Sequence, residues 1–193
     1  MTVPPPSDLP TVIVLASGRG ERFRASGGTQ HKLSAPLGGR PVLEWTLDAV
    51  RASGLPWHLE DVGHPGMGDS IAAAVRATAG AAGWLVLPAD LPLVRPDTLR
   101  RVADALAAGA AAVHPQHEGQ RGHPVAFAAG ARDALLALSG ERGAAPVLQA
   151  LRARGEVLDL LVDDIGTVTD IDTLADLAAA EALLTARGLS SSR

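Results

Sequence analysis

Two unbroken apolar runs, each followed at once by a polar segment, constrain the fold of this chain most strongly. TVIVLA at residues 11–16 leads into the loop SGRGER, and WLVLP at residues 84–88 leads within two residues to Asp90. Short runs of this kind, rich in β-branched residues, are typical of strands covered on both faces. In open α/β sheets, ligands bind beyond the carboxyl ends of such strands. We therefore expect the glycine loop and Asp90 to share one functional edge of a sheet.

Further strands and helices alternate along the rest of the chain. The pattern predicts strands at residues 57–62, 110–114, 124–128 and 156–162, and helices at residues 40–53, 66–80, 132–138 and 144–153. It also predicts a helix from Pro96 and a last helix that carries Leu174, Leu177 and Leu184. This alternation predicts a three-layer α/β/α fold, Rossmann-like, with a mostly parallel sheet. We expect a flexible leader over residues 1–10, a single domain over residues 11–187 and a frayed tail over residues 188–193.

The composition excludes several classes of function. The chain has 193 residues, 47% of them apolar, which suits a packed globule without disulfide support. It has no cysteine, so thiolate zinc sites and cysteine nucleophiles are excluded. A net charge of −4 argues against binding along a nucleic-acid backbone. The chain shows neither a signal-peptide pattern nor an apolar run of the ~20 residues that a membrane span needs, so we expect a cytoplasmic protein with no membrane partner.

The loop after the first strand combines glycines with cations. Gly18 and Gly20 allow a backbone to approach a phosphate closely, and Arg19, Arg22 and Lys32 follow within a short stretch. The loop is neither a Walker motif nor a dinucleotide fingerprint, since Phe23 stands at the third glycine position. By itself the loop fits either a phosphate site or an ordinary turn with solvated arginines.

A series of motifs in a fixed order resembles one enzyme family. The chain is similar to the molybdenum cofactor cytidylyltransferases and to the NTP transferases that resemble molybdopterin-guanine-dinucleotide synthases. The resemblance implies the nucleotide-diphospho-sugar-transferase type of fold and covers most of residues 11–184. It rests on these segments: LASGRGERF, HKLSAPLGGRPVLEW, GMGDSIAAAV, LPADLPLV, GQRGHPVAF, SGERGAAPVL and DIDTLADL.

The same resemblance implies roles for individual residues. It places Lys32, Arg22 and Asp90 in catalysis and Arg121 and His123 at the acceptor. It assigns the nucleotide to Leu15, Ala16, Ser17, Gly18, Arg19, Gly20, Lys32, Gly68, Ser70 and Asp90.

Two carboxylates are the expected metal ligands. Asp90 and Asp172 match the positions that hold Mg²⁺ in the family, with Mn²⁺ as an alternative, and Asp170 could replace Asp172. Read from the residues alone, Asp90 fits a strand-end cap and Asp172 fits the N-cap of the last helix equally well.

The resemblance implies transfer of CMP from CTP to molybdopterin, with release of pyrophosphate. A molybdoenzyme maturation factor is a further implied partner. Ser17 stands where relatives carry alanine or glycine. In the relatives, alanine at this position is typical of enzymes that use CTP, and glycine of enzymes that use GTP. We interpret serine as favouring CTP. The segment between Gly54 and Gly66 lacks the extra strand and helix of relatives. GTP, a sugar phosphate acceptor, or a non-catalytic nucleotide- or cofactor-binding module therefore remain alternatives.

Overall fold

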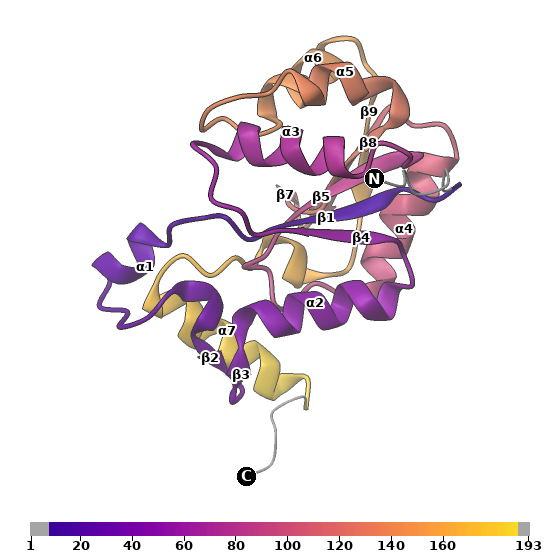
Figure 1. Ribbon diagram of the computed structural model, residues 1–193. Helices are drawn as coiled ribbons and strands as arrows, with labels where there is room; N and C mark the ends of the chain where they lie inside the picture. The colour runs from indigo at the N-terminus through magenta and orange to yellow at the C-terminus, as the bar shows by residue number, and fades with distance from the viewer. Residues whose placement is uncertain (1–7, 189–193) are drawn as a thin grey trace.

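The computed structural model describes residues 8–188, which form a central sheet with helices on both faces (Figure 1). The strands follow the order β4-β1-β5-β8-β6-β7, and β9 also pairs with β6. All run in one direction except β8 and the short β7, which confirms a mostly parallel sheet. The strands are β1 Thr11–Leu15, β4 Trp57–Glu60, β5 Gly83–Pro88, β6 Ala112–His117, β7 Gln120–Arg121, β8 Val125–Ala128 and β9 Val157–Leu161.

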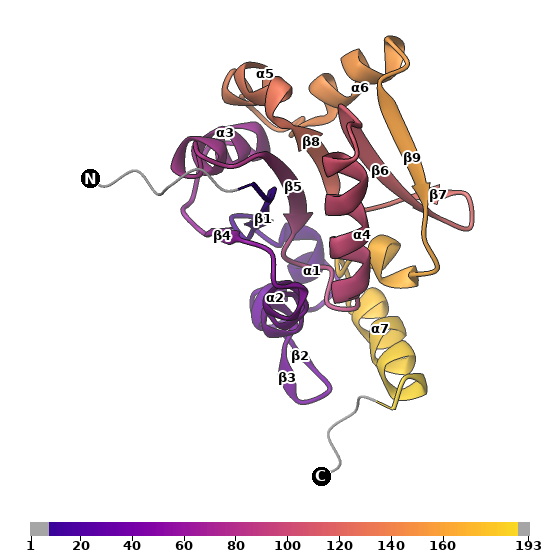
Figure 2. The same ribbon diagram turned by 90° about the vertical axis from the view of Figure 1, so that its right-hand side faces the viewer.

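Helices cover the sheet in two groups, as Figure 2 shows. One face carries α2, α4 and α7, and the other carries α3, α5 and α6. This arrangement confirms the expected three-layer α/β/α architecture. The helices are α1 Glu21–Ala25, α2 Val42–Ser53, α3 Met67–Ala77, α4 Pro96–Ala107, α5 Arg132–Leu136, α6 Ala145–Ala153 and α7 Leu174–Ala186.

The first strand shows why its run of apolar residues is unbroken. Val12 and Val14 of β1 pack on the face of α2 and α4, whereas Ile13 packs on the face of α3. Side chains of a strand alternate between the two faces, and here both faces are buried, so each position requires an apolar residue.

The register of the central strands places their carboxyl ends level. Leu15 of β1 pairs with Glu60 of β4 on one side and with Pro88 of β5 on the other. The three segments that follow these strands therefore leave the sheet at the same edge. This edge carries the glycine loop and Asp90, as the sequence predicts.

Two boundaries differ from the expected ones. The helix expected at residues 40–53 begins at Val42, because Arg40–Pro41 forms strand β3 of a small hairpin with β2, Pro36–Leu37. The strand expected at residues 110–114 spans Ala112–His117 and turns back into β7 through Glu118 and Gly119, both of which have positive φ. Local turn chemistry at these glycine-containing segments outweighed the apolar pattern on which the prediction relied.

The expected leader and tail lie mostly outside the described residues. Within residues 8–188, no helix is both long enough and apolar enough to cross a membrane.

Candidate functional site

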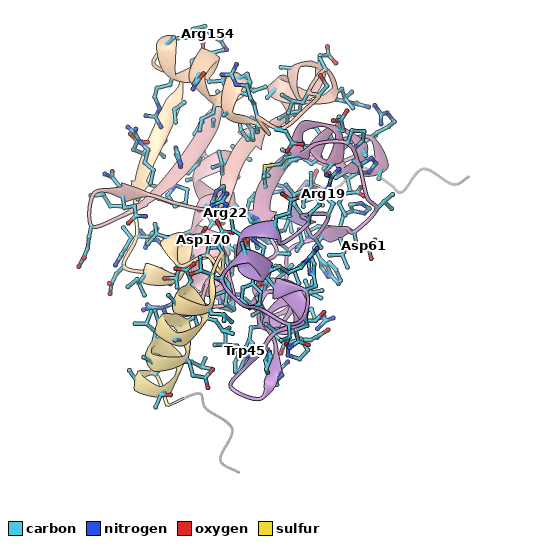
Figure 3. The ribbon with its side chains drawn as sticks, turned by 90° about the vertical axis from the view of Figure 1, so that its left-hand side faces the viewer. Arg19, Arg22, Trp45, Asp61, Arg154 and Asp170 are labelled. Atoms are coloured by element: carbon cyan, nitrogen blue, oxygen red, sulfur yellow. The ribbon has the colours of Figure 1, made fainter. Side chains whose placement is uncertain are left out.

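A cavity of about 430 Å³ opens at the carboxyl ends of β1 and β5. It is lined by seven of the residues that are expected to bind the nucleotide. Ala16, Gly68 and Ser70, which are also expected there, do not line it. Figure 3 views this side of the molecule, with Arg19, Arg22 and Asp170 in its central part and Arg154 at a distant end. The expected residues that line the cavity are Leu15, Ser17, Gly18, Arg19, Gly20, Lys32 and Asp90, together with Arg22 and Asp172.

Hydrogen bonds from neighbouring side chains hold the glycine loop. His31 Nε2 lies 2.8 Å from the carbonyl oxygen of Gly18, and Arg24 donates to the carbonyl oxygen of Arg19 at 2.5 Å. Gly20 adopts φ 63° where the loop turns into α1, a conformation that favours glycine. Arg24 and His31 thus support the backbone, and the side chains of Arg19 and Arg22 stay largely exposed.

Lys32 joins the two predicted metal ligands. Its Nζ donates to Asp90 Oδ2 at 2.6 Å and to Asp172 Oδ1 at 2.7 Å. Arg22 donates to the other oxygen of Asp172 at 2.5 Å. The structure therefore brings together four residues that the sequence assigns to catalysis or to metal binding, from segments up to 150 residues apart.

The ion pairs oppose the cost of burial in this cluster. Burial alone would lower the pKa of Lys32, but Asp90 and Asp172 outweigh it and raise that pKa above its usual value. Burial would raise the pKa of Asp172, yet Lys32 and Arg22 hold it below its usual value. Burial and the neighbouring carboxylates both raise the pKa of Asp170. Lys32 and Asp172 consequently remain charged at neutral pH.

The donor set at Asp90 and Asp172 fits a divalent cation. Asp90 Oδ1 is buried and has no hydrogen-bond partner within residues 8–188. Mg²⁺ commonly takes one or two carboxylates and completes its shell with water and substrate phosphates. The described residues contain no cluster of three or more potential ligands, so such a site would depend on substrate oxygens.

The structure corrects one of the two interpretations of Asp172. Asp172 is not the N-cap of the last helix, because Thr173 occupies that position and forms a capping box with Asp176. The capping box satisfies backbone N–H groups at the start of α7. The carboxylate of Asp172 is therefore not needed as a cap, and Asp172 lines the cavity.

The start of α3 has a packing role. A Cβ at Gly68 would lie 2.8 Å from the backbone of Ser139, and the amide of Gly68 donates to Gly140. Ser70 is buried, and its hydroxyl lies 2.8 Å from that of Ser17. Of the two serines, only Ser17 lines the cavity, and its hydrogen bond with Ser70 orients the Ser17 hydroxyl.

The two residues expected at the acceptor lie apart from the cavity lining. Arg121 on β7 is half-exposed and lies 3.2 Å from Asp159, which it shares with Arg152. Burial lowers the pKa of His123, although the Asp90 carboxylate acts in the opposite direction. His123 Nδ1 is buried without a hydrogen-bond partner among the described residues. His123 therefore lies close to Asp90, whereas Arg121 belongs to a separate ion-pair network.

Several cavity residues escaped the sequence prediction, among them His64, Pro65 and Glu141. They come from the segment after β4 and from the loop before α6. The pairing of β4 with β1 is the signal that could have identified His64, since the segment after β4 must face the same edge.

The model of the MobA-like NTP transferase domain matches residues 48–156, more than half of the chain. The chain belongs to this family. The matched range includes Asp90, whereas the glycine loop, Lys32 and Asp172 lie outside it. A curated relative, the bifunctional protein GlmU of Geobacter metallireducens, is 32% identical over 125 residues. That alignment covers 52% of this chain and 26% of the relative, so the chain spans about a quarter of its length.

Solved structures show the same fold. A nucleotidyl transferase from Methanothermobacter superposes with a TM-score of 0.75 at 21% identity, covering 94% of this chain and 100% of that one. The manganese complex of Rv0371c from Mycobacterium tuberculosis gives 0.67 at 23% identity, covering 90% and 98%. Molybdopterin-guanine dinucleotide biosynthesis protein A from Archaeoglobus fulgidus gives 0.61 at 22% identity, covering 91% and 99%. At these identities the likeness concerns the fold.

Proposed function

We propose that the protein is a Mg²⁺-dependent nucleotidyltransferase that moves CMP from CTP to molybdopterin and releases pyrophosphate. The observation that carries the proposal is the junction of Lys32, Asp90 and Asp172 beside the glycine loop, inside one cavity. Phosphoryl chemistry of this type needs positioned cations and a metal site, and it needs no protein nucleophile.

The cavity offers the charge that a triphosphate requires. Arg19 and Arg22 reach it from the loop, and Lys32 reaches it from the segment that follows. Guanidinium and ammonium groups bind phosphate oxygens through charge-assisted hydrogen bonds. We therefore place the triphosphate at this cationic side, with its reacting phosphates near Lys32.

The reaction balances without a redox partner. A phosphate oxygen of the acceptor attacks the α-phosphorus of CTP and forms a new phosphoanhydride bond. The bond from the α-phosphorus to the bridging oxygen breaks, and pyrophosphate leaves with that electron pair. Arg22 and Lys32 stabilise the negative charge on the phosphates, which amounts to electrostatic stabilisation of the transition state.

Asp90 and Asp172 would hold the metal ion, and Mg²⁺ bound there would neutralise charge on the reacting phosphates. Mn²⁺ is the alternative ion, in keeping with the manganese complex of a protein with the same fold. The buried and unpartnered Asp90 Oδ1 supports this assignment, because such an oxygen is costly to leave without a ligand.

Two further details of the proposal concern the substrates. Ser17 supports CTP, since it stands at a cavity position where family members that use CTP carry alanine. Molybdopterin as acceptor is supported by the motif resemblance and by the name of one structural neighbour. His123, beside the cluster, and Arg121, farther along the sheet, are the proposed acceptor contacts. We place the reaction in the cytoplasm, with a molybdoenzyme maturation factor as a subsequent partner.

Two assays test the proposal in sequence. Thermal shifts are measured with CTP, GTP, ATP and UTP, each with Mg²⁺ and with EDTA; a hundredfold excess over Kd should stabilise the fold by about 2.7 kcal/mol. Pyrophosphate release is then followed with molybdopterin as acceptor. Mg²⁺-dependent stabilisation by CTP and release that requires molybdopterin would support the proposal.

Other outcomes point to the alternatives. Stronger stabilisation by GTP than by CTP would identify GTP as the nucleotide donor. Turnover only with a sugar phosphate would identify a sugar phosphate, not molybdopterin, as the acceptor. Failure of every nucleotide to bind would contradict the nucleotidyltransferase itself and favour a non-catalytic module that binds the cofactor.

A further inference from the structure

The nucleotide cavity has two chemically different sides. Arg19, Arg22 and Lys32 gather on the side of the glycine loop and α1. At the start of α3 the lining contains no Lys or Arg among the described residues, and it includes His64, Pro65 and Met67. A triphosphate belongs on the cationic side, so its nucleoside is left with the side of α3.

A buried carboxylate fixes the orientation of His64. Glu60, the last residue of β4, is 5% exposed, and its Oε1 lies 3.2 Å from His64 Nε2. Its Oε2 lies 3.5 Å from His58 Nε2, and the amide of Val62 donates to Oε1. An ionised carboxylate only accepts hydrogen bonds, so His64 donates its Nε2 proton to Glu60. In the neutral imidazole, Nδ1 is then an acceptor.

The acceptor nitrogen of His64 has no hydrogen-bond partner among the described residues. Within residues 8–188, Nε2 is the only ring atom of His64 that makes a hydrogen bond. Met67, which also lines the cavity, is 49% exposed and offers an apolar surface against which a planar base can pack. His64 thus presents an oriented, unused acceptor on the side of the cavity that is left for the base.

We propose that His64 determines base specificity by accepting a hydrogen bond, through Nδ1, from the exocyclic amino group of cytosine. The inference rests on the proposed function, because it assumes that a nucleoside triphosphate occupies this cavity. Cytosine carries a 4-amino donor, whereas uracil carries a 4-oxo acceptor in the same place. An acceptor aimed at that position favours CTP, and it leaves two acceptors facing each other when UTP binds.

Equilibrium binding of CTP and UTP tests the inference directly, because the two ligands differ at the position in question. Titration calorimetry is carried out with the full chain and Mg²⁺ at about pH 8. Wild-type protein should bind CTP about tenfold more tightly than UTP, the effect of about one net hydrogen bond. In His64→Gln, whose amide reaches toward the position of Nε2, the preference should disappear. In His64→Asn, whose oxygen can take the position of Nδ1, part of the preference should return.

His58 provides the matched control. It contacts the same carboxylate as His64 but does not line the cavity, so His58→Gln should keep the preference for CTP. Equal binding of CTP and UTP by the wild type, or a preference that survives in His64→Gln, would overturn the role of His64 while nucleotide binding itself persists. Failure of the wild type to bind any nucleotide would overturn the proposed function, and the role of His64 with it.

Discussion

Lys32 and Asp90 form an ion pair of 2.6 Å between Nζ and Oδ2, and the same ammonium lies 2.7 Å from Asp172 Oδ1. Both carboxylates face one cation, and the side chain of Lys32 is only 12% exposed. The ammonium therefore takes the place between the carboxylates that a divalent cation would use. The proposed metal ion would have to displace it or share the carboxylates with it, so Lys32 would compete with the metal until substrate phosphates offer the ammonium another partner.

Replacing Lys32 should therefore increase metal affinity in the absence of nucleotide. We expect Lys32→Met to bind Mn²⁺ about tenfold more tightly than the wild type, since two uncompensated carboxylates attract the ion. The free-ion signal of Mn²⁺ in electron paramagnetic resonance measures the affinity. Arg40→Met removes a cation that is paired with Asp48 outside the cavity, so it should leave the affinity unchanged. Unchanged or weaker binding by Lys32→Met would contradict the competition.

Asp90 is the residue whose loss should affect turnover most. Asp90→Asn keeps the size of the side chain and removes the charge, so the fold should remain and kcat should fall about 10³-fold, as is typical for loss of a metal or electrostatic contact. Pyrophosphate release gives kcat, and circular dichroism reports the fold. Asp61 also follows a strand at the carboxyl edge but does not line the cavity, so Asp61→Asn is the control (Figure 3). Near-normal turnover in Asp90→Asn would rule out the metal assignment.

The sequence predicts the parts of the fold that depend on burial. The strands β1 and β5 are buried on both faces, and this burial leaves an unbroken apolar run that can be recognised without a structure. Because both strands are parallel neighbours, their carboxyl ends and the functional segments after them are also predictable. The pairing of Lys32 with Asp172 is beyond such an argument, because it depends on where α7 packs.

Other features depend on local geometry that a periodic pattern does not encode. The strand β7 rests on a two-residue turn at Glu118 and Gly119, and the polar sequence there resembles a loop. The role of Thr173 as N-cap was concealed because Asp172 is an equally good capping residue by type. His64 shows no motif at all. Both His64 and His58 contact Glu60, so only its place on the cavity distinguishes His64 from His58.

Two glycines of the predicted nucleotide site should respond differently to alanine. A Cβ at Gly68 would meet the backbone of Ser139 at 2.8 Å, so Gly68→Ala should lower the free energy of unfolding by about 2 kcal/mol. A Cβ at Gly18 meets no atom within 4 Å, so Gly18→Ala should fold with wild-type stability. Since Gly18 lines the cavity, the added methyl group should instead weaken CTP binding, by about tenfold.

Urea unfolding and CTP titration separate the two effects. Gly18→Ala should bind CTP more weakly and keep the wild-type free energy of unfolding. Gly68→Ala should mainly lower the free energy of unfolding. An equal loss of stability in both variants would contradict the open space around the Cβ position of Gly18. Unchanged CTP affinity in Gly18→Ala would remove this loop from the nucleotide site.

His114 should make the fold sensitive to acid. Burial is the main cause that lowers the pKa of His114 from 6.5 to about 4, and the Arg152 guanidinium, whose Nη2 lies 3.2 Å from His114 Nδ1, acts in the same direction. Between these two values the unfolded chain binds a proton at this residue and the folded chain does not. The free energy of unfolding therefore falls as the pH falls through this window. At pH 5 the loss should be about 1 kcal/mol, after allowance for solvent screening at a partly exposed residue.

His114→Gln removes the titrating group, so it should lose about 1 kcal/mol less than the wild type between pH 7 and pH 5. Urea unfolding at the two pH values measures this difference, and the ring proton signals of His114 in NMR spectra should titrate near the low value. Parallel losses in wild type and variant would show that burial and the Arg152 guanidinium do not hold this imidazole neutral.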